Sequence, residues 1–178
     1  MAIVRDIGEG AMLFCGLLYF NSVVCDVAIG ALAGAFGRVA LQSEEFQWDY
    51  YRHYADELGH PIYRCFIVIE GLFDSGAIAD VKCRTNELEN DLSISGKRQV
   101  NIDPGYITLA KVVLASTKNY AHRVYLRDGI YAEVTLLYNT RGTYMSHLFT
   151  YPDYKEPATI KFLLQARKTL KKLETLKK

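Results

Sequence analysis

A continuous run of apolar residues, AMLFCGLLYF, occupies residues 11–20. An apolar run of this length predicts a central strand that is covered on both faces. Asn21 or Ser22 can then cap a helix that continues to about Phe36, and Gly37 is well placed to end it. The first two elements are therefore expected to be a buried strand and a helix.

The pattern continues with further strands and one more helix. Arg38 to Asp49 is expected to be a second strand, and the apolar stretch from Cys65 to Leu72 a third. Ser75 to Leu92 has helix-forming composition, and a short strand is expected from Arg98 to Asp103. The resulting order, βαββαβ, is typical of a ferredoxin-like core, whose two central strands would be the two most apolar ones.

The rest of the chain extends this core. Ile107 to Thr117 is expected to be a helix, although its β-branched content leaves a strand open. Ala121 to Tyr138 is expected to be a β-hairpin, and Pro157 onward an amphipathic helix. The apolar side of that last helix carries Leu163, Ala166, Leu170 and Leu173. We expect one α+β domain over residues 1–178, with a core at about 11–104 and an extension at about 105–178.

The hairpin allows a prediction of register. A three-residue loop, Arg127 to Gly129 with Gly129 left-handed, separates an apolar from a polar face better than a two-residue turn does. The apolar face would then pair Leu126 with Ile130, Val124 with Ala132 and His122 with Val134. The other face would pair Tyr125 with Tyr131, Arg123 with Glu133 and Ala121 with Thr135. This second face is either a solvated surface with a weak ion pair or the floor of a polar pocket.

Polar residues also gather around residues 101–118. On a helix, Thr108, Lys111, Ala115 and Lys118 would share one stripe. The stripe is either the solvated side of that helix or an anion site. Asp103 and the Pro104-Gly105 corner would lead from a strand directly into the helix, and binding sites are commonly built at such positions.

Composition and charge narrow the function. The 178 residues carry a net charge of +1, yet residues 161–178 hold seven Lys or Arg and one Glu, which leaves about −5 for residues 1–160. We therefore expect no duplex nucleic acid partner, because such proteins usually carry a basic stripe across the fold.

The cysteines and the first residues bear on location. The four cysteines are widely spaced, which favours reduced thiols in a cytoplasmic protein. Export and membrane insertion are disfavoured, because Asp6 and Glu9 lie where a basic region is expected and Asn21 and Asp26 follow the apolar run.

Two other motifs each have a structural and a functional interpretation. Gly30 and Gly34 lie in a glycine-rich stretch, GALAGAFG, which lacks the lysine and hydroxyl of a P-loop and so favours close helix packing. The side chains of Asp49, His53, Glu57 and His60 would share one helical face and could ligate zinc, although a solvated amphipathic turn is the favoured interpretation.

Several segments carry a family resemblance. They are GLLY at 16–19, TNELE at 85–89, VNIDPGYITLAKVVLASTKNYAHRVYLRDGIYAEVTLLY at 100–138 and TYPDY at 150–154. The chain resembles a bacterial family of uncharacterised domains of unknown function, some of whose members carry an automatic label of GTP-binding protein. The resemblance covers nearly the whole chain and implies no established activity. The residues that match the family pattern between 101 and 135 are Asn101, Asp103, Gly105, Tyr106, Lys111, Ser116, Thr117, Lys118, His122, Arg123, Tyr125, Gly129, Tyr131, Glu133 and Thr135. Tyr54, Glu57, Gly59, Pro152 and Asp153 also match, whereas His53 and His60 do not.

These observations lead to one main hypothesis. We expect the protein to bind a phosphorylated small molecule or nucleotide, with hydrolase or transferase activity left open. Asp103, His122 and Glu133 are the candidate catalytic residues. The candidate ligand-binding residues are Asn101, Tyr106, Lys111, Lys118, Arg123, Tyr125, Tyr131 and Thr135. No metal ligands are assigned, and a divalent metal ion is the only cofactor considered.

Two alternatives stay open. The first is a non-catalytic interaction module, or a homo-oligomer, that uses the tyrosine-rich sheet face and the basic last helix. The second is single-stranded RNA binding by the sheet, for which the central strands offer aromatic residues but few basic neighbours.

Overall fold

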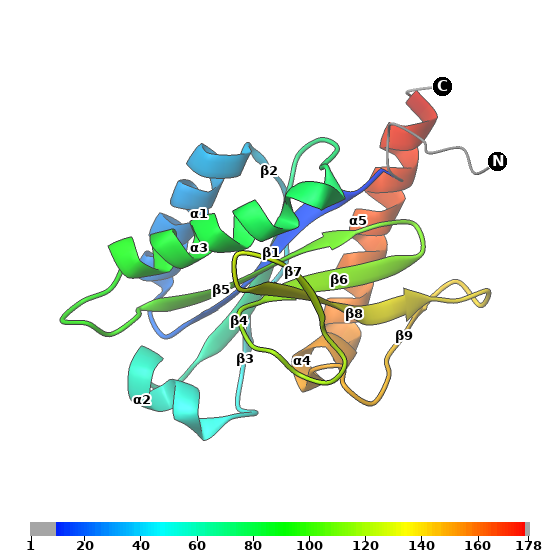
Figure 1. The fold of residues 1–178 in the computed structure, drawn as a ribbon. Coiled ribbons are helices and arrows are strands. Elements are labelled where there is room, and N and C mark those ends of the chain that lie inside the picture. Colours follow the sequence, from blue (N-terminus) through cyan, green and yellow to red (C-terminus); the bar gives the residue numbers. More distant parts are fainter. Residues whose placement is uncertain (1–9, 177–178) are drawn as a thin grey trace.

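The structure, a computed structural model, describes residues 10–176. Its strands join one antiparallel sheet in the order β2-β4-β1-β5-β6-β8-β7, with β3 paired to β4 and β9 paired to β8. Helices α1 and α3 cover one face of the sheet and α5 crosses the other (Figure 1). The expected α+β class is confirmed. Asp6 and Glu9, two of the residues that disfavour export, lie outside the described residues.

The elements have the following bounds. The strands are β1 (Met12–Tyr19), β2 (Val39–Gln42), β3 (Phe46–Gln47), β4 (Tyr63–Ile69), β5 (Val100–Ile107), β6 (Lys111–Ser116), β7 (Val124–Arg127), β8 (Ile130–Tyr138) and β9 (Tyr144–Met145). The helices are α1 (Ser22–Phe36), α2 (Ala55–Leu58), α3 (Ile78–Asp91), α4 (Pro152–Lys155) and α5 (Pro157–Leu176), with short 3-10 turns at Arg52–Tyr54 and Ser75–Ala77. None of the helices within residues 10–176 is both long and apolar enough to cross a membrane.

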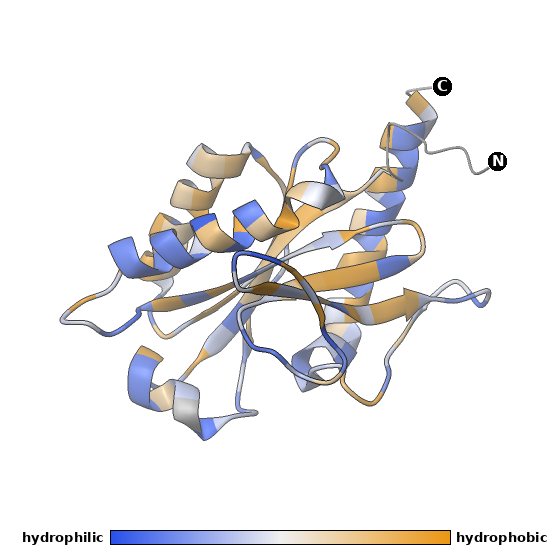
Figure 2. Cartoon of the chain, in the orientation of Figure 1, coloured by the Kyte–Doolittle hydropathy of each residue, from blue (hydrophilic) through white to orange (hydrophobic). Residues whose placement is uncertain are grey.

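The sheet separates two hydrophobic clusters. One lies beneath α1 and α3 and includes Leu32 and Ile67. The other lies beneath α5 and includes Phe14, Phe66 and Leu163. Figure 2 shows hydrophobic residues concentrated in the central strands and hydrophilic stretches along α3 and α5. Both faces of β1 and β4 are therefore covered, which explains why these two strands are apolar apart from Arg64 in β4.

The first elements agree closely with the pattern. Asn21 caps α1 by accepting a hydrogen bond from the Val23 amide at 2.8 Å, and Gly37 ends the helix with φ of 113°. The interpretation of Gly30 and Gly34 as packing glycines is wrong. A Cβ at either position would meet nothing within 4 Å, so both glycines lie on the open side of α1.

The expected strand from Arg38 to Asp49 is two short strands. Both β2 and β3 pair with β4, and the chain leaves the sheet between them. In this gap the Ser43 hydroxyl accepts a hydrogen bond from the Phe66 amide at 2.8 Å. A side chain here satisfies an amide that a continuous strand partner would otherwise bind.

The expected helix over residues 107–117 is wrong. β5 continues through Pro104 and Gly105 without a corner, turns at residues 108–110 and returns as β6. The Thr108 hydroxyl accepts hydrogen bonds from the amides of Ala110 and Lys111, at 3.1 and 3.2 Å, and so supports the turn. Pairing of β6 with both β5 and β8 outweighs the weak local preference for a helix.

The hairpin is confirmed, but its turn is not the three-residue loop. Asp128 and Gly129 both have positive φ, 53° and 75°, which defines a two-residue turn between Arg127 and Ile130. The ladder then shifts at Leu126, which replaces the predicted pair of Leu126 with Ile130.

Beyond this bulge the predicted register is correct. Val124 lies opposite Ala132, and Tyr125 lies opposite Tyr131. The orientation of the faces is the unexpected feature. Glu133 on the polar face is buried at 4% exposure, whereas Val134 on the apolar face is 39% exposed. Glu133 on the polar face therefore points into the protein, where it binds Arg123, His122 and Thr135.

The C-terminal helix is confirmed from Pro157. Leu163, Ala166 and Leu170 are fully buried against the sheet, and Leu173 packs at the edge of the same cluster.

Candidate functional site

A cavity of about 320 Å³ opens where β6 diverges from β5. The two strands pair only from Gly105 and Leu114 to Ile107 and Val112, so the first half of β5 has no partner on that side. Six charged residues line the cavity: Arg64, Asp103, Lys118, Arg123, Glu133 and Asp153. Six aromatic residues line it as well: Trp48, Tyr51, Tyr54, Tyr120, Tyr151 and Tyr154. This volume lies at the lower end of the range of small-molecule sites in proteins.

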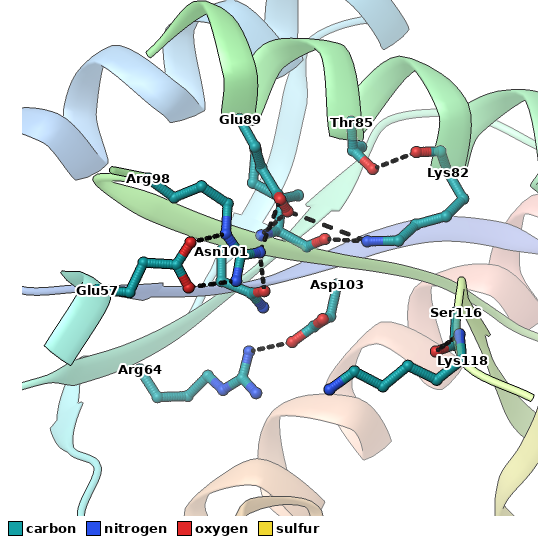
Figure 3. A network of polar contacts seen from close by, with 11 residues as sticks. Glu57, Arg64, Lys82, Thr85, Glu89, Arg98, Asn101, Asp103, Ser116 and Lys118 are labelled. Carbon is teal, nitrogen blue, oxygen red and sulfur yellow. Dashed lines mark hydrogen bonds and ion pairs between the residues drawn. The ribbon is translucent and has the colours of Figure 1, made fainter. Parts of the chain in front are cut away.

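Side chains of α3 satisfy the unpaired edge of β5. The Ile102 amide donates to Glu89 Oε1 at 2.6 Å, and the Ile102 carbonyl accepts from Lys82 Nζ at 2.8 Å (Figure 3). Pro104 follows two residues later on the same edge, and proline has no amide proton to satisfy. The two strands can therefore diverge without leaving buried amides unpaired.

A buried arginine organises the first half of the cavity wall. The guanidinium of Arg64 on β4 donates from Nε to Asp153 at 2.8 Å and from Nη1 to Asp103 at 3.1 Å. Its path crosses Gly16 on β1, where a Cβ would lie 2.7 Å from Nη1 and 3.0 Å from the Phe66 ring. Glycine in the middle of β1 is thus required for Arg64 to span three strands.

The ion pairs keep both Arg64 and Asp103 in their charged forms. Burial opposes the charge of Arg64, but Asp153 and Asp103 outweigh it and hold the pKa of Arg64 above its usual value. Burial also acts against the Asp103 carboxylate, yet Arg64 and Lys82 keep the pKa of Asp103 below its usual range. Both groups are consequently charged at neutral pH.

A second arginine organises the other half. Arg123 donates from Nε to Glu133 at 2.6 Å, from Nη1 to the Ser116 hydroxyl at 2.7 Å and to the Lys118 carbonyl at 2.8 Å. Its Nη2 donates to the Tyr151 hydroxyl at 2.5 Å. The predicted contact between Arg123 and Glu133 is confirmed, and it is a buried, fully bonded pair and not a solvated one.

His122 and Thr135 support Glu133 from behind. His122 Nε2 lies 2.8 Å from Glu133 Oε2, and its ring stacks on Phe149 at 4.3 Å between centroids. The Thr135 hydroxyl donates weakly to Glu133 Oε1 at 3.4 Å. Neither residue lines the cavity, so both act as positioning groups for the carboxylate.

Lys118 is the cation of the wall that remains available. Within residues 10–176 its ammonium forms no ion pair, whereas both arginines are neutralised by carboxylates. Figure 3 shows its side chain pointing toward Asp103, and both residues line the cavity. Asp103 Oδ2 accepts from Arg64, and its side chain is 31% exposed. An open lysine and a partly open carboxylate therefore face the same space.

The aromatic residues supply neutral surfaces. The Trp48 ring meets Tyr54 at 5.3 Å and Tyr51 at 5.8 Å between centroids. Burial raises the pKa of Tyr54 to about 12, and burial likewise raises the pKa of Tyr151. These phenols are therefore protonated at neutral pH.

Asn101 belongs to a neighbouring network. Its Oδ1 accepts from Arg98 Nη1 at 2.9 Å, and Arg98 also bonds Glu57 at 2.6 and 2.7 Å and Glu89 at 3.0 Å (Figure 3). This network ties α2, α3 and β5 together beside the cavity.

The other predicted binding residues lie elsewhere. Tyr106 packs against Phe73 at 6.5 Å, and Lys111 begins β6 opposite Leu137. Tyr125 and Tyr131 form an edge-to-face pair at 5.3 Å on the hairpin. None of these four predicted residues is part of the cavity wall. Lys111 and Lys118 do not form a stripe, because they occupy the start of a strand and the loop after it.

The zinc alternative gains no support. Asp49 and His60 are 3.8 Å apart, but both are exposed, and Glu57 is bound by Arg98. The side chain of His53 lies outside the described part of the structure. Among the described side chains there is no group of three or more His, Cys, Asp or Glu that could hold a metal.

Sequence reasoning missed Arg64 and Asp153 as wall residues, although Asp153 matched the family pattern. The signal for Arg64 was present, since it is the single charged residue in the apolar strand YRCFIVI. A lone charge in a buried strand requires a buried partner, and the glycine in β1 marks where that partner is reached.

Fold and site together define an α+β protein with a polar, aromatic-walled cavity at a break in its sheet. The family model described as "Domain of unknown function (DUF4416)" matches residues 9–170, and the chain belongs to this family. Comparisons with curated proteins and with solved structures found no match.

Proposed function

We propose that the cavity binds a phosphorylated small molecule or a nucleotide. One observation carries the proposal: Lys118, the unpaired cation of the wall, faces a cavity that aromatic rings line. A lysine ammonium is a common phosphate ligand, and aromatic faces accept the rings of sugars and bases. Asp103 would accept a hydrogen bond from a hydroxyl or amino group of the ligand.

The test is a thermal-shift panel of nucleotides, sugar phosphates and inorganic phosphate. A ligand at a hundred times its dissociation constant stabilises the fold by about 2.7 kcal/mol. We expect a shift for the wild type and a clearly smaller shift for Lys118→Ala at the same ligand concentration. The matched control is Lys111→Ala, which removes a lysine outside the cavity and should keep the shift. No shift with any phosphate compound would refute the proposal.

Hydrolase or transferase activity is a further part of this hypothesis. Asp103 is charged and partly open, whereas Glu133 Oε2 already accepts from Arg123 and His122. Asp103 is therefore the better general base, and Glu133 would orient Arg123 and His122. Glu133→Gln should lower turnover while binding is largely retained. Unchanged turnover in this variant would remove Glu133 from the mechanism.

A second candidate function is protein interaction or homo-oligomer formation. Exposed apolar side chains gather on and after the hairpin, namely Val124, Tyr125, Val134, Leu137, Met145 and Leu148. The exposed side of α5 adds Lys161, Lys168, Lys171 and Lys172. Sedimentation of the wild type and of Leu148→Ser tests self-association, and Lys168→Glu with Lys172→Glu tests an acidic partner. Removal of α5 is unsuitable, because its buried side completes the core.

Fold and location complete the proposal. Two features support a ferredoxin-like core that β6 to β9 extend. The chain runs through β1, α1, β2, β4, α3 and β5, and these strands lie in the order β2-β4-β1-β5 in the sheet. The four free thiols support a cytoplasmic location. We assign no role to duplex nucleic acid or to membranes.

A further inference from the structure

The charge balance of the cavity wall limits what the site can hold. Its three cationic residues are matched by three carboxylates, Asp103, Glu133 and Asp153. Arg64 is bonded to two of these carboxylates and Arg123 to the third. The wall is therefore formally neutral, and one cation, Lys118, is free to meet a ligand.

A single free cation can compensate one anionic group well and several groups poorly. A nucleoside triphosphate brings three phosphates, and proteins that bind it use several backbone amides, a lysine and a magnesium ion together. Here the other cationic donors of the wall are occupied, since Arg123 Nη1 binds Ser116 and the Lys118 carbonyl and its Nη2 binds Tyr151. A second and third phosphate would lie against carboxylates without compensation.

The aromatic residues point to a planar ring as the second part of the ligand. Residues 48–54 contribute Trp48, Tyr51 and Tyr54 to the wall, and the loop after β6 contributes Tyr120, whose ring stacks on Arg123 at 4.8 Å. A sugar phosphate would leave much of this surface unused. A nucleobase has two flat faces that aromatic side chains bind.

We infer that the site recognises a nucleoside monophosphate, with the phosphate at Lys118 and the base among the aromatic residues. This inference rests on the proposed function and narrows it to one ligand class. It also excludes a nucleoside triphosphate as the preferred ligand. The label GTP-binding protein, which some members of the family carry, would suggest such a ligand.

The chain provides its own reporter for a test. Trp48 is the single tryptophan of the 178 residues, it is 4% exposed, and it lines the cavity. We would titrate the wild type with the four ribonucleoside 5′-monophosphates, the corresponding triphosphates with and without Mg²⁺, the free nucleosides, ribose 5-phosphate and inorganic phosphate, and follow Trp48 fluorescence. Calorimetry would provide a second readout.

The expected result is that one monophosphate binds about tenfold or more tightly than its triphosphate and than ribose 5-phosphate. Lys118→Ala should weaken the monophosphate about tenfold and leave the nucleoside unchanged. Tyr120→Ala should weaken the monophosphate and leave ribose 5-phosphate unchanged. Lys111→Ala is the matched lysine control, and it should leave the binding of the monophosphate and of ribose 5-phosphate unchanged.

The opposite outcomes separate this inference from the proposed function. Equal or tighter binding of the triphosphate would overturn the single-anion argument, and equal binding of ribose 5-phosphate would overturn the role of the ring. In both cases phosphate binding at Lys118 would stand. If no phosphate compound binds, the inference and the proposed function both fail.

Discussion

Arg64 on β4 donates a hydrogen bond to Asp103 on β5 at 3.1 Å, although strand β1 lies between them. The contact is made over Gly16, whose missing side chain leaves room for the guanidinium. Gly16, which does not line the cavity, thus permits the ion pair between two charged residues of its wall.

Gly16→Ala tests this arrangement. The added methyl would lie 2.7 Å from Arg64 Nη1 and 3.0 Å from the Phe66 ring. We expect a loss of about 1–3 kcal/mol in the free energy of unfolding, measured by urea denaturation. Gly34→Ala is the control, because it lies in open space on α1 and should raise stability by about 0.5–1 kcal/mol. If Gly16→Ala leaves the free energy of unfolding unchanged, Arg64 can reach Asp103 without the space above Gly16.

Asp153→Ala tests the buried ion pair. Asp153 is 2% exposed and binds two nitrogens of Arg64, at 2.8 and 2.6 Å. Its removal leaves a buried guanidinium with one partner, so we expect a loss of about 3–5 kcal/mol on urea denaturation. A double variant, Arg64→Met with Asp153→Leu, should lose less than Asp153→Ala alone. If the double variant loses as much or more, the cost of Asp153→Ala does not come from the unpaired guanidinium of Arg64.

The stability lost in Asp103→Asn should depend on pH. The pKa of Asp103 in the folded protein is below its ordinary value of 3.8. The carboxylate therefore contributes stability above about pH 4, and this contribution is lost as the pH falls through the lowered pKa. We expect Asp103→Asn to lose about 1–3 kcal/mol at pH 7, and this difference from the wild type should shrink as the pH falls below about 4. A difference that does not change between pH 7 and pH 3 would contradict the ion pair with Arg64.

Glu89 tests how the free edge of β5 is satisfied. Glu89→Ala removes the acceptor of the Ile102 amide and should cost about 1–3 kcal/mol, with faster hydrogen exchange at that amide. Glu89→Gln keeps an acceptor oxygen and should largely preserve protection of the Ile102 amide. Equal exchange rates in the two variants would mean that another group binds this amide.

The sequence allowed most elements up to residue 103 to be predicted because they have clear local signals, whereas the division of residues 38–49 into β2 and β3 was not predicted. The apolar run of β1, the Asn21 cap and Gly37 are examples, and all lie where expected. Residues 107–117 were misassigned because their composition suits both a helix and a strand. Pairing with β8, which follows later in the chain, decides between the two.

The candidate site was predictable only in part, for a similar reason. Arg123 and Glu133 are close in sequence on one hairpin, so register alone brings them together. Arg64, Asp103 and Asp153 come from three distant segments, and their contact depends on the order of strands and on the position of α4. The periodicity of apolar residues within one segment does not show in which order the strands lie or where α4 packs.

The turn at Asp128-Gly129 and the bulge at Leu126 have a further consequence at the outer end of the sheet. β7 is the terminal strand, and its exposed Val124, Tyr125 and Leu126 would make a regular edge prone to aggregation. The strand is four residues long, and the bulge breaks its ladder. An incoming strand finds no regular edge to continue, so growth of the sheet into fibrils is opposed. Self-association at this end of the sheet is therefore expected to use side-chain surfaces and not the edge of β7.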